Sequence, residues 1–257
     1  MIRDIRINLF TVTIILICLG IVMIYSASNI YCWEKYNDEF FFLKRHISFV
    51  LIGGLLTFLV MSFDYRRLKK YAKPLLIVSF VLLILVLIPG IGREVAGARR
   101  WFRFKFLSFQ PSEFANLAVI IYAADFIARK GNILATFWKG FLPPMLVLGA
   151  TLLFILIQPD LGTSVALGIV IMIMLFISGI RFSYLVSLVL LSIPALYVLI
   201  FSVPYRRMRI MAFLNPYLDP KGSGFQIIQS QIALGSGGLF GVGIGQSKQK
   251  LFYLPAA

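Results

Sequence analysis

Seven apolar runs, separated by short polar segments, decide the fold class of this chain. Lipid offers the backbone no hydrogen-bond partners, so runs long enough to cross a bilayer at ~1.5 Å per residue must be helices. With 60% hydrophobic and only 14% charged residues, the composition excludes an ordinary soluble domain. We predict an all-α polytopic membrane protein with seven transmembrane helices and a large extracytoplasmic loop. The predicted spans are about Ile7–Ala27, Ile47–Met61, Pro74–Pro89, Pro111–Ala128, Phe141–Ile157, Leu161–Ile177 and Tyr184–Phe201.

The segment after the seventh run, residues 204–257, is of a different kind. It is rich in Gly, Gln, Lys and Arg, and each unpaired polar group would cost several kcal/mol in lipid. A long solvated loop is one interpretation. Isoleucine and leucine at helical spacing, with glycines at bends, favour a folded, re-entrant or surface-lying element. We therefore divide the chain into a bundle, 1–203, and part of a large extracytoplasmic loop, 204–257.

The net charge of +15 indicates anionic partners, which for a membrane protein are lipid headgroups by default, and we expect no nucleic-acid partner. Counting Lys and Arg does not orient the chain, because 11 lie on the N-terminal side and 14 on the other. The densest short block, Phe63–Lys73, favours a cytoplasmic N-terminus. Basic residues then concentrate outside, at 93–105 and 206–250, either as a functional surface or as a headgroup-binding one.

Two similar motifs precede spans. Gln110-Pro111-Ser112-Glu113 begins the fourth span, and Gln158-Pro159-Asp160 precedes the sixth. A proline at the first helical position and an acid in the first turn are ordinary helix-start chemistry, which alone can explain them. Two helix N-termini facing the same side as two basic loops can also form an anion-binding mouth.

Asp125 lies near the inner end of the fourth span. An acid at such a position is either functional or paired at the interface with Arg129, one turn away. His46 is interpreted as an interfacial residue rather than a metal ligand, because no cluster of Cys, His or carboxylate residues accompanies it.

The sequence resembles the SEDS family of bacterial envelope proteins, which includes FtsW, RodA and SpoVE. The resemblance extends over essentially the whole chain, with several motifs in the family's order, and two stretches are closer to the FtsW and SpoVE branch. The matching stretches are MIYSAS (Met23–Ser28), GARRWF (Gly97–Phe102), QPSEFA (Gln110–Ala115), QPDLGTS (Gln158–Ser164) and most of Pro204–Pro255.

The resemblance implies a peptidoglycan glycosyltransferase of the bacterial inner membrane, working in cell division or shape. Its implied substrate is lipid II, an undecaprenyl-diphosphate-linked disaccharide-pentapeptide, polymerised at the outer face. Its implied partners are a class B penicillin-binding protein and other divisome or elongasome membrane proteins. The family has ten spans, and its essential Asp follows a Tyr-Leu-Pro element. Here Tyr253-Leu254-Pro255 stands just before Ala257, so that Asp and the last three spans are expected beyond this residue.

Glycosyl transfer from a diphosphate needs a carboxylate base and cations for the leaving group. A divalent cation, Mg or Mn, bridging the diphosphate would suit this chemistry, although no ligand set identifies one. Many relatives carry Lys where this chain has Asn116, so an acid–lysine pair does not carry over. For each arginine, interfacial snorkelling is the alternative. The candidate substrate-binding residues are Arg99, Arg100, Trp101, Gln110, Glu113, Asp160, Arg206, Arg209, Lys248 and Lys250.

Two other functions fit the same features. A lipid II flippase would also use broken helices, outward cations and intramembrane acids. A division scaffold would need no chemistry at all.

Overall fold

The computed structural model describes residues 2–95, 98–103, 108–243 and 245–247. The chain forms two compact units, Phe63–Ala195 and the combination of Met1–Ser62 with Leu196–Ala257. This division follows contacts rather than the membrane. The predicted division into a bundle, 1–203, and an extracytoplasmic loop, 204–257, therefore stays a prediction.

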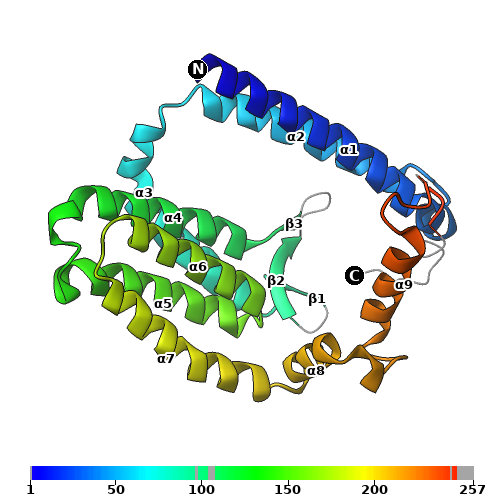
Figure 1. Cartoon of the computed structure of the whole chain (residues 1–257). Helices are drawn as coiled ribbons and strands as arrows, with labels where there is room; N and C mark the ends of the chain where they lie inside the picture. The colour runs from blue at the N-terminus through cyan, green and yellow to red at the C-terminus, as the bar shows by residue number, and fades with distance from the viewer. Residues whose placement is uncertain (1, 96–97, 104–107, 244, 248–257) are drawn as a thin grey trace. The chain divides into compact units, whose positions relative to one another are not determined.

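The first unit, Phe63–Ala195, is a bundle of apolar helices. Its core contains Leu83, Val119, Ile155, Ile171 and Leu175, all with at most 2% of their surface exposed. Figure 1 shows α4, α5 and α6 side by side. The unit's helices are η1 (Tyr65–Arg67), α3 (Leu68–Leu87), α4 (Pro111–Lys130), η2 (Gly131–Ile133), η3 (Phe137–Phe141), α5 (Leu142–Ile157), α6 (Leu161–Ile177) and most of α7 (Phe182–Phe201).

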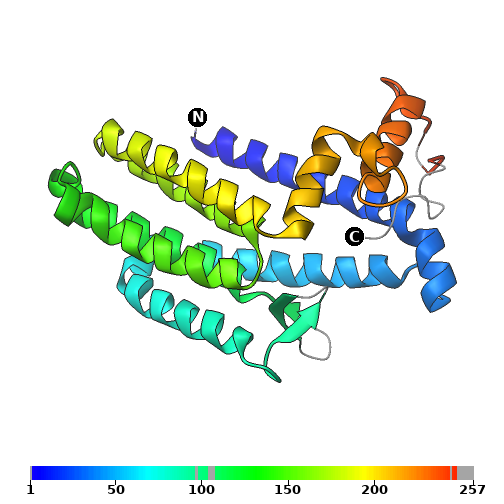
Figure 2. The ribbon, with the colours of Figure 1, turned by 90° about the horizontal axis from the view of Figure 1, so that it is seen from below.

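A small antiparallel sheet lies at one end of this bundle (Figures 1 and 2). Its strands are β1 (Arg93–Val95), β2 (Ala98–Arg103) and β3 (Ser108–Phe109), in the order β1-β2-β3. Gly92 leads into β1, and a Cβ at that position would collide with the carbonyl group of Val86. Only glycine lets the strand begin so close to the end of α3. The sequence analysis predicted a polar loop here and missed the sheet.

The second unit begins with a helical hairpin, α1 (Ile2–Tyr36) and α2 (Phe41–Met61). Tyr36 stacks on Phe41 with a centroid distance of 4.1 Å, and Tyr25 stacks on Phe40 at 5.4 Å. These aromatic pairs close the turn between the helices, where Asn37 has a positive φ of 54°. Most of the segment 28–46, which separates the first two predicted spans, therefore continues α1 or begins α2.

The same unit ends in three helical segments, α8 (Pro204–Leu214), η4 (Pro216–Leu218) and α9 (Phe225–Gly237). The segment is therefore a folded element rather than a structureless loop, as the spacing of its isoleucines predicted. Pro204 and Pro216 each stand at the start of their helix, where the missing N–H costs nothing.

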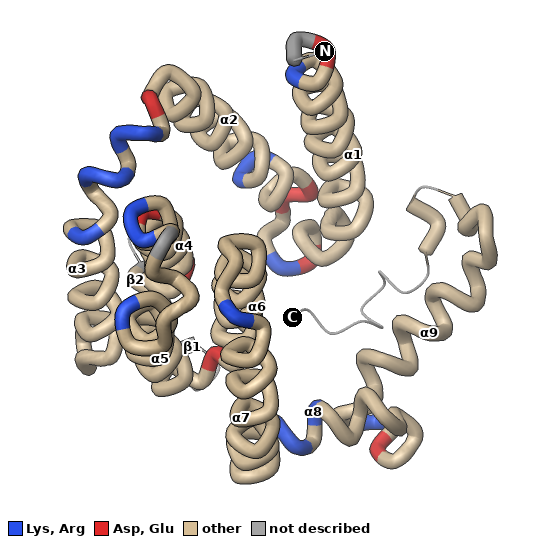
Figure 3. The backbone as a smooth tube through the Cα atoms, turned by 60° about the vertical axis from the view of Figure 1, so that its left-hand side comes forward, with Lys and Arg blue, Asp and Glu red and all other residues tan. Residues whose placement is uncertain are grey.

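The seven predicted spans all form apolar helices. Among the described residues, six helices are long and apolar enough to cross a membrane, and α6 is apolar but shorter at 17 residues. Few or no residues are buried in the spanning parts of α1, α2 and α7, as expected where lipid rather than protein covers the side chains. Lys and Arg gather at helix ends and connections (Figure 3). The fold is that of a multi-pass membrane protein.

Candidate functional site

Arg100 of β2 joins the sheet to the turn between α5 and α6. Its Nε donates to the carbonyl of Gln158 at 2.7 Å, and its Nη2 donates to the carbonyl of Pro159 at 2.5 Å. These carbonyls lie just past the last turn of α5, where backbone acceptors lack helical partners. A predicted substrate ligand is thus engaged by the protein itself.

Gln110 and Asp160, from the two predicted helix starts, meet at this end of the bundle. The Nε2 of Gln110 donates to Oδ2 of Asp160 at 3.2 Å and to Oγ of Ser112 at 2.8 Å. Asp160 is also the N-cap of α6, accepting from the backbone N–H of Thr163 at 3.3 Å and from its hydroxyl at 2.9 Å. Both the helix-start role and the convergence of the two motifs are therefore real.

Arg99 and Glu94 face each other across β1 and β2, with Nε and Oε2 3.4 Å apart. The Arg99 side chain is 40% exposed and the Glu94 side chain 55% exposed, so the pair adds little stability. They border a cleft of about 300 Å³ whose remaining walls are Leu87, Ala98, Ile157 and Pro159. Trp101, the next residue of β2, is half-buried.

Glu113 and Asn116 lie in the first two turns of α4. The Glu113 side chain is exposed and its backbone N–H bonds to Gln110. The Oδ1 of Asn116 is buried and has no hydrogen-bond partner within the described parts of the chain. The Asn116 side chain is therefore a buried hydrogen-bond acceptor that receives no hydrogen bond from the described residues.

The predicted cations of the second unit have local partners. The Nη1 of Arg206 donates to the carbonyl of Leu199 at 2.9 Å, which caps the end of α7. The guanidinium of Arg209 lies over the ring of Tyr205, 4.8 Å from its centroid. Lys248 and Lys250 lie outside the described residues.

Asp219 organises the turn before α9. Its carboxylate accepts from the backbone N–H groups of Gly222 at 3.0 Å and Ser223 at 2.8 Å, and from the Ser223 hydroxyl at 3.2 Å. The Ser223 N–H, followed by its hydroxyl and the Gly222 N–H, lowers the pKa of Asp219 below its ordinary value. The sequence analysis did not single out this residue, although Asp before Pro and two glycines is a turn signal.

No group of three or more His, Cys, Asp or Glu side chains within the described ranges could hold a metal ion. The divalent cation considered from the sequence therefore stays a prediction.

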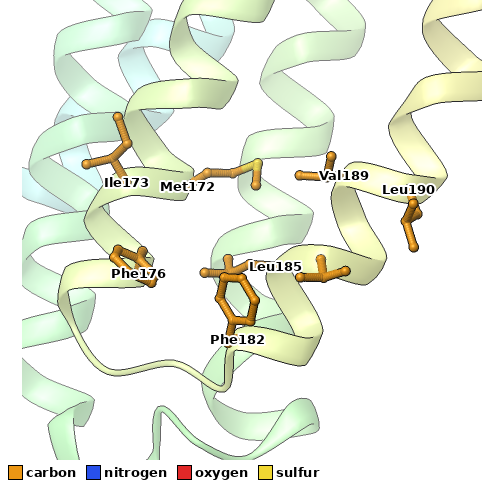
Figure 4. A pocket seen from close by; sticks show the side chains of 8 residues that line it. Met172, Ile173, Phe176, Phe182, Leu185, Val189 and Leu190 are labelled. Atoms are coloured by element: carbon orange, nitrogen blue, oxygen red, sulfur yellow. The ribbon is translucent and has the colours of Figure 1, made fainter.

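An apolar groove of about 330 Å³ lies between α6 and α7 (Figure 4). Every lining side chain is apolar, so the groove offers no polar group for specific recognition. Its walls are Met172, Ile173, Phe176, Phe182, Leu185, Val186, Val189 and Leu190.

Comparison with known proteins decides the family. The family model described as "Cell cycle protein", which covers FtsW, RodA and SpoVE, matches residues 6–257. The chain belongs to the FtsW/RodA/SpoVE family. Among the relatives of this SEDS chain, "Probable peptidoglycan glycosyltransferase FtsW" of Geobacter sulfurreducens is 46% identical over 94% of the chain and 65% of that relative. Stage V sporulation protein E of Bacillus subtilis is 43% identical over 96% and 68%.

Solved structures agree with this membership in the SEDS family. One match, with a TM-score of 0.66 and 34% identity, is a chain from a peptidoglycan synthase complex. That structure is described as showing how the complex coordinates polymerization and crosslinking. That match covers 88% of this chain and 65% of the other. Thermus thermophilus RodA matches with a TM-score of 0.64 and 26% identity, over 96% and 64%. This SEDS chain thus spans about two thirds of the length of its relatives.

Proposed function

We propose that this protein polymerises lipid II as a peptidoglycan glycosyltransferase. The single observation that carries the proposal is the 46% identity, over 94% of the chain, to an FtsW named as a probable enzyme of this class. The site geometry agrees with it. The N-termini of α4 and α6 meet beside a strand that carries three arginines, and such positive ends favour a diphosphate.

The proposed reaction joins two glycan units. A carboxylate base takes the proton of the attacking sugar hydroxyl, a glycosidic C–O bond forms, and the bond from the donor sugar to the diphosphate breaks. Cations stabilise the negative charge that collects on the departing diphosphate. The family resemblance implies an Asp as this base.

Contacts within the protein guide the choice of proposed substrate ligands. Arg100, Gln110 and Asp160 already bond to the protein, so we assign substrate contact to residues whose polar groups remain accessible. Arg99 borders the cleft, and its exposed partner Glu94 can release it at small cost. Trp101 can stack on a sugar face. Glu113 and Arg209 are also exposed, whereas the substrate contacts of Lys248 and Lys250 stay predictions from the sequence.

The proposed setting is the bacterial cytoplasmic membrane, with the N-terminus in the cytoplasm and the sheet outside. Labelling of a cysteine introduced at Ser223 in intact cells tests the orientation. Reaction with a membrane-impermeant maleimide is expected, because Ser223 lies after seven spans. Labelling only after lysis would place residues 204–257 in the cytosol, out of reach of the donor.

The proposed partner is a class B penicillin-binding protein, which would crosslink the glycan strands. Relatives named FtsW and Stage V sporulation protein E favour a division or sporulation complex over an elongation complex. Co-purification of the tagged full-length protein with its genome's class B enzymes tests this choice.

The decisive experiment gives purified full-length protein lipid II in detergent and measures glycan polymer on a gel. Polymer is expected for the wild type, and Arg99→Ala is expected to lower turnover while membrane insertion stays unchanged. Translocation of fluorescent lipid II across vesicles without polymer would instead favour the flippase. Partner binding with neither activity would favour the scaffold.

A further inference from the structure

The Arg100 guanidinium binds two consecutive carbonyls with two different nitrogens. Its Nε and Nη2 donate to Gln158 and Pro159, which lie 58 and 59 residues further along the chain. A guanidinium is planar and holds its donors in a fixed fork, so two such bonds fix both distance and direction. A lysine ammonium at the same place keeps the charge but cannot reproduce the fork.

The turn held by Arg100 is connected to the rest of the bundle on two further sides. The Gln158 side chain is 1% exposed, and its Nε2 points to the carbonyl of Leu83 on α3 at 3.5 Å. Asp160, two residues on, accepts from Gln110 of α4 and caps α6. One short turn is therefore hydrogen-bonded to β2 and α4, caps α6 and lies against α3.

We propose that Arg100 is a positioning residue, whose fork holds the α5–α6 turn so that Asp160 and the N-terminus of α6 keep their place in the mouth. This deepens the proposed function and rests on it for the activity readouts. It assigns Arg100 a role distinct from direct contact with the diphosphate. Two carbonyls already occupy the Nε–Nη2 edge of the guanidinium, so a diphosphate could reach only its remaining Nη hydrogens.

The test compares Arg100→Lys and Arg100→Gln in the purified full-length protein. Arg93→Gln is the matched control, because Arg93 is an exposed arginine of the neighbouring strand of the same sheet. Hydrogen exchange is followed in the peptide covering residues 155–164, whose amides include Asp160 N–H to Ile155 and Ser164 N–H to Asp160. Polymerisation of lipid II gives kcat and KM for each protein.

A positioning role predicts that Lys does not rescue. Both Arg100 variants should exchange about tenfold faster or more in this peptide, since two hydrogen bonds to a charged donor are lost or misplaced. Both should lower kcat about tenfold or more and leave KM within about twofold, while Arg93→Gln matches the wild type. If Arg100→Gln is not recovered folded, Arg100→Lys alone carries the test, because it keeps the charge.

Three results would overturn the proposal. Wild-type exchange and activity in Arg100→Lys would show that charge alone matters. Both variants could raise KM with exchange unchanged, which would indicate a substrate ligand. Equal acceleration in Arg93→Gln would indicate general loosening of the sheet. A wild-type protein that makes no polymer would refute the proposed function, while the exchange data would still decide the role of Arg100.

Discussion

The Asp125 carboxylate and the Arg129 guanidinium form an ion pair one turn apart on α4. Nε and Nη2 of Arg129 lie 2.9 and 2.6 Å from Oδ2 of Asp125. The Asp125 side chain is 8% exposed and the Arg129 side chain 46% exposed. Of the two roles open from the sequence, a functional acid and an interfacial pair, the geometry supports the pair.

This asymmetry in burial predicts unequal effects of breaking the pair. Arg129→Gln leaves a buried carboxylate uncompensated and is expected to cost about 1–3 kcal/mol. Asp125→Asn leaves the charge on a half-exposed arginine that water can solvate, and is expected to cost less. Thermal unfolding in detergent compares both with the double variant and with the exposed neighbour Lys130→Gln as control. Equal losses for the two single variants would contradict the prediction.

The Asp219 turn predicts a pH dependence in the segment that precedes α9. Hydrogen bonds lower the folded-state pKa of Asp219 below its ordinary value of 3.8. The stability they give is therefore fully present above about pH 4 and is lost as pH falls through the folded-state pKa. Carboxyl carbon NMR of the labelled protein should show a titration midpoint below 3.8.

Ser223→Ala is the matched change for this titration. It removes the hydroxyl donor to Asp219 but keeps the backbone N–H, so the midpoint should rise only part of the way toward the ordinary value. A wild-type midpoint at the ordinary value would show that the turn does not form.

The close packing around Gly224, between η4 and α9, leaves no room for a side chain at this position. A Cβ here would collide with the carbonyl oxygen of Pro216 and lie 2.9 Å from that of Asp219. Gly224→Ala is therefore expected to cost about 1–3 kcal/mol and to speed hydrogen exchange in α9. Gly235→Ala, in open space within the same helix, is the control and should slow exchange slightly, because alanine favours helix by about 0.5–1 kcal/mol. Slower exchange in both variants would contradict the collision.

The sequence predicts the helices of this protein well because local composition is enough to identify a membrane span. Runs such as Leu161–Ile177 need only their own residues to identify them. The sheet was missed because its strands are two to six residues long, and its pairing of Glu94 with Arg99 is not a compositional signal. The first span was predicted to end at Ala27, but α1 continues to Tyr36. Aromatic contacts such as Tyr36 on Phe41 support this extension, and hydropathy alone does not predict them.

The candidate site was predictable in part. Counting spans placed Gln110 and Asp160 on one side of the membrane, and the structure brings them within 3.2 Å. The partners of Arg100 were not predictable, because they are backbone carbonyls 58 and 59 residues away and any residue type presents those. The residue type of Arg100 indicated an anion ligand, whereas its guanidinium is hydrogen-bonded to two carbonyls of the protein.

The surroundings of the Gln158 side chain predict that an apolar side chain can replace it. Its Oε1 is buried with no hydrogen-bond partner in the described residues, and its Nε2 reaches Leu83 only at 3.5 Å. Gln158→Leu exchanges an unsatisfied acceptor and a long hydrogen bond for apolar contact, so its effect on stability is expected within about 1 kcal/mol.

Gln158→Glu is the informative counterpart, because it keeps the shape and changes only the chemistry. A carboxylate at a side chain that is 1% exposed loses the donor to Leu83 and faces that carbonyl oxygen, which predicts a cost of about 3 kcal/mol or more. Thermal unfolding at pH 8 measures both variants, and the Glu variant should recover part of its stability at pH 5, where the acid is more readily protonated. A Leu variant less stable than the Glu variant would show that the Gln158 amide makes a strong bond that the distances do not indicate.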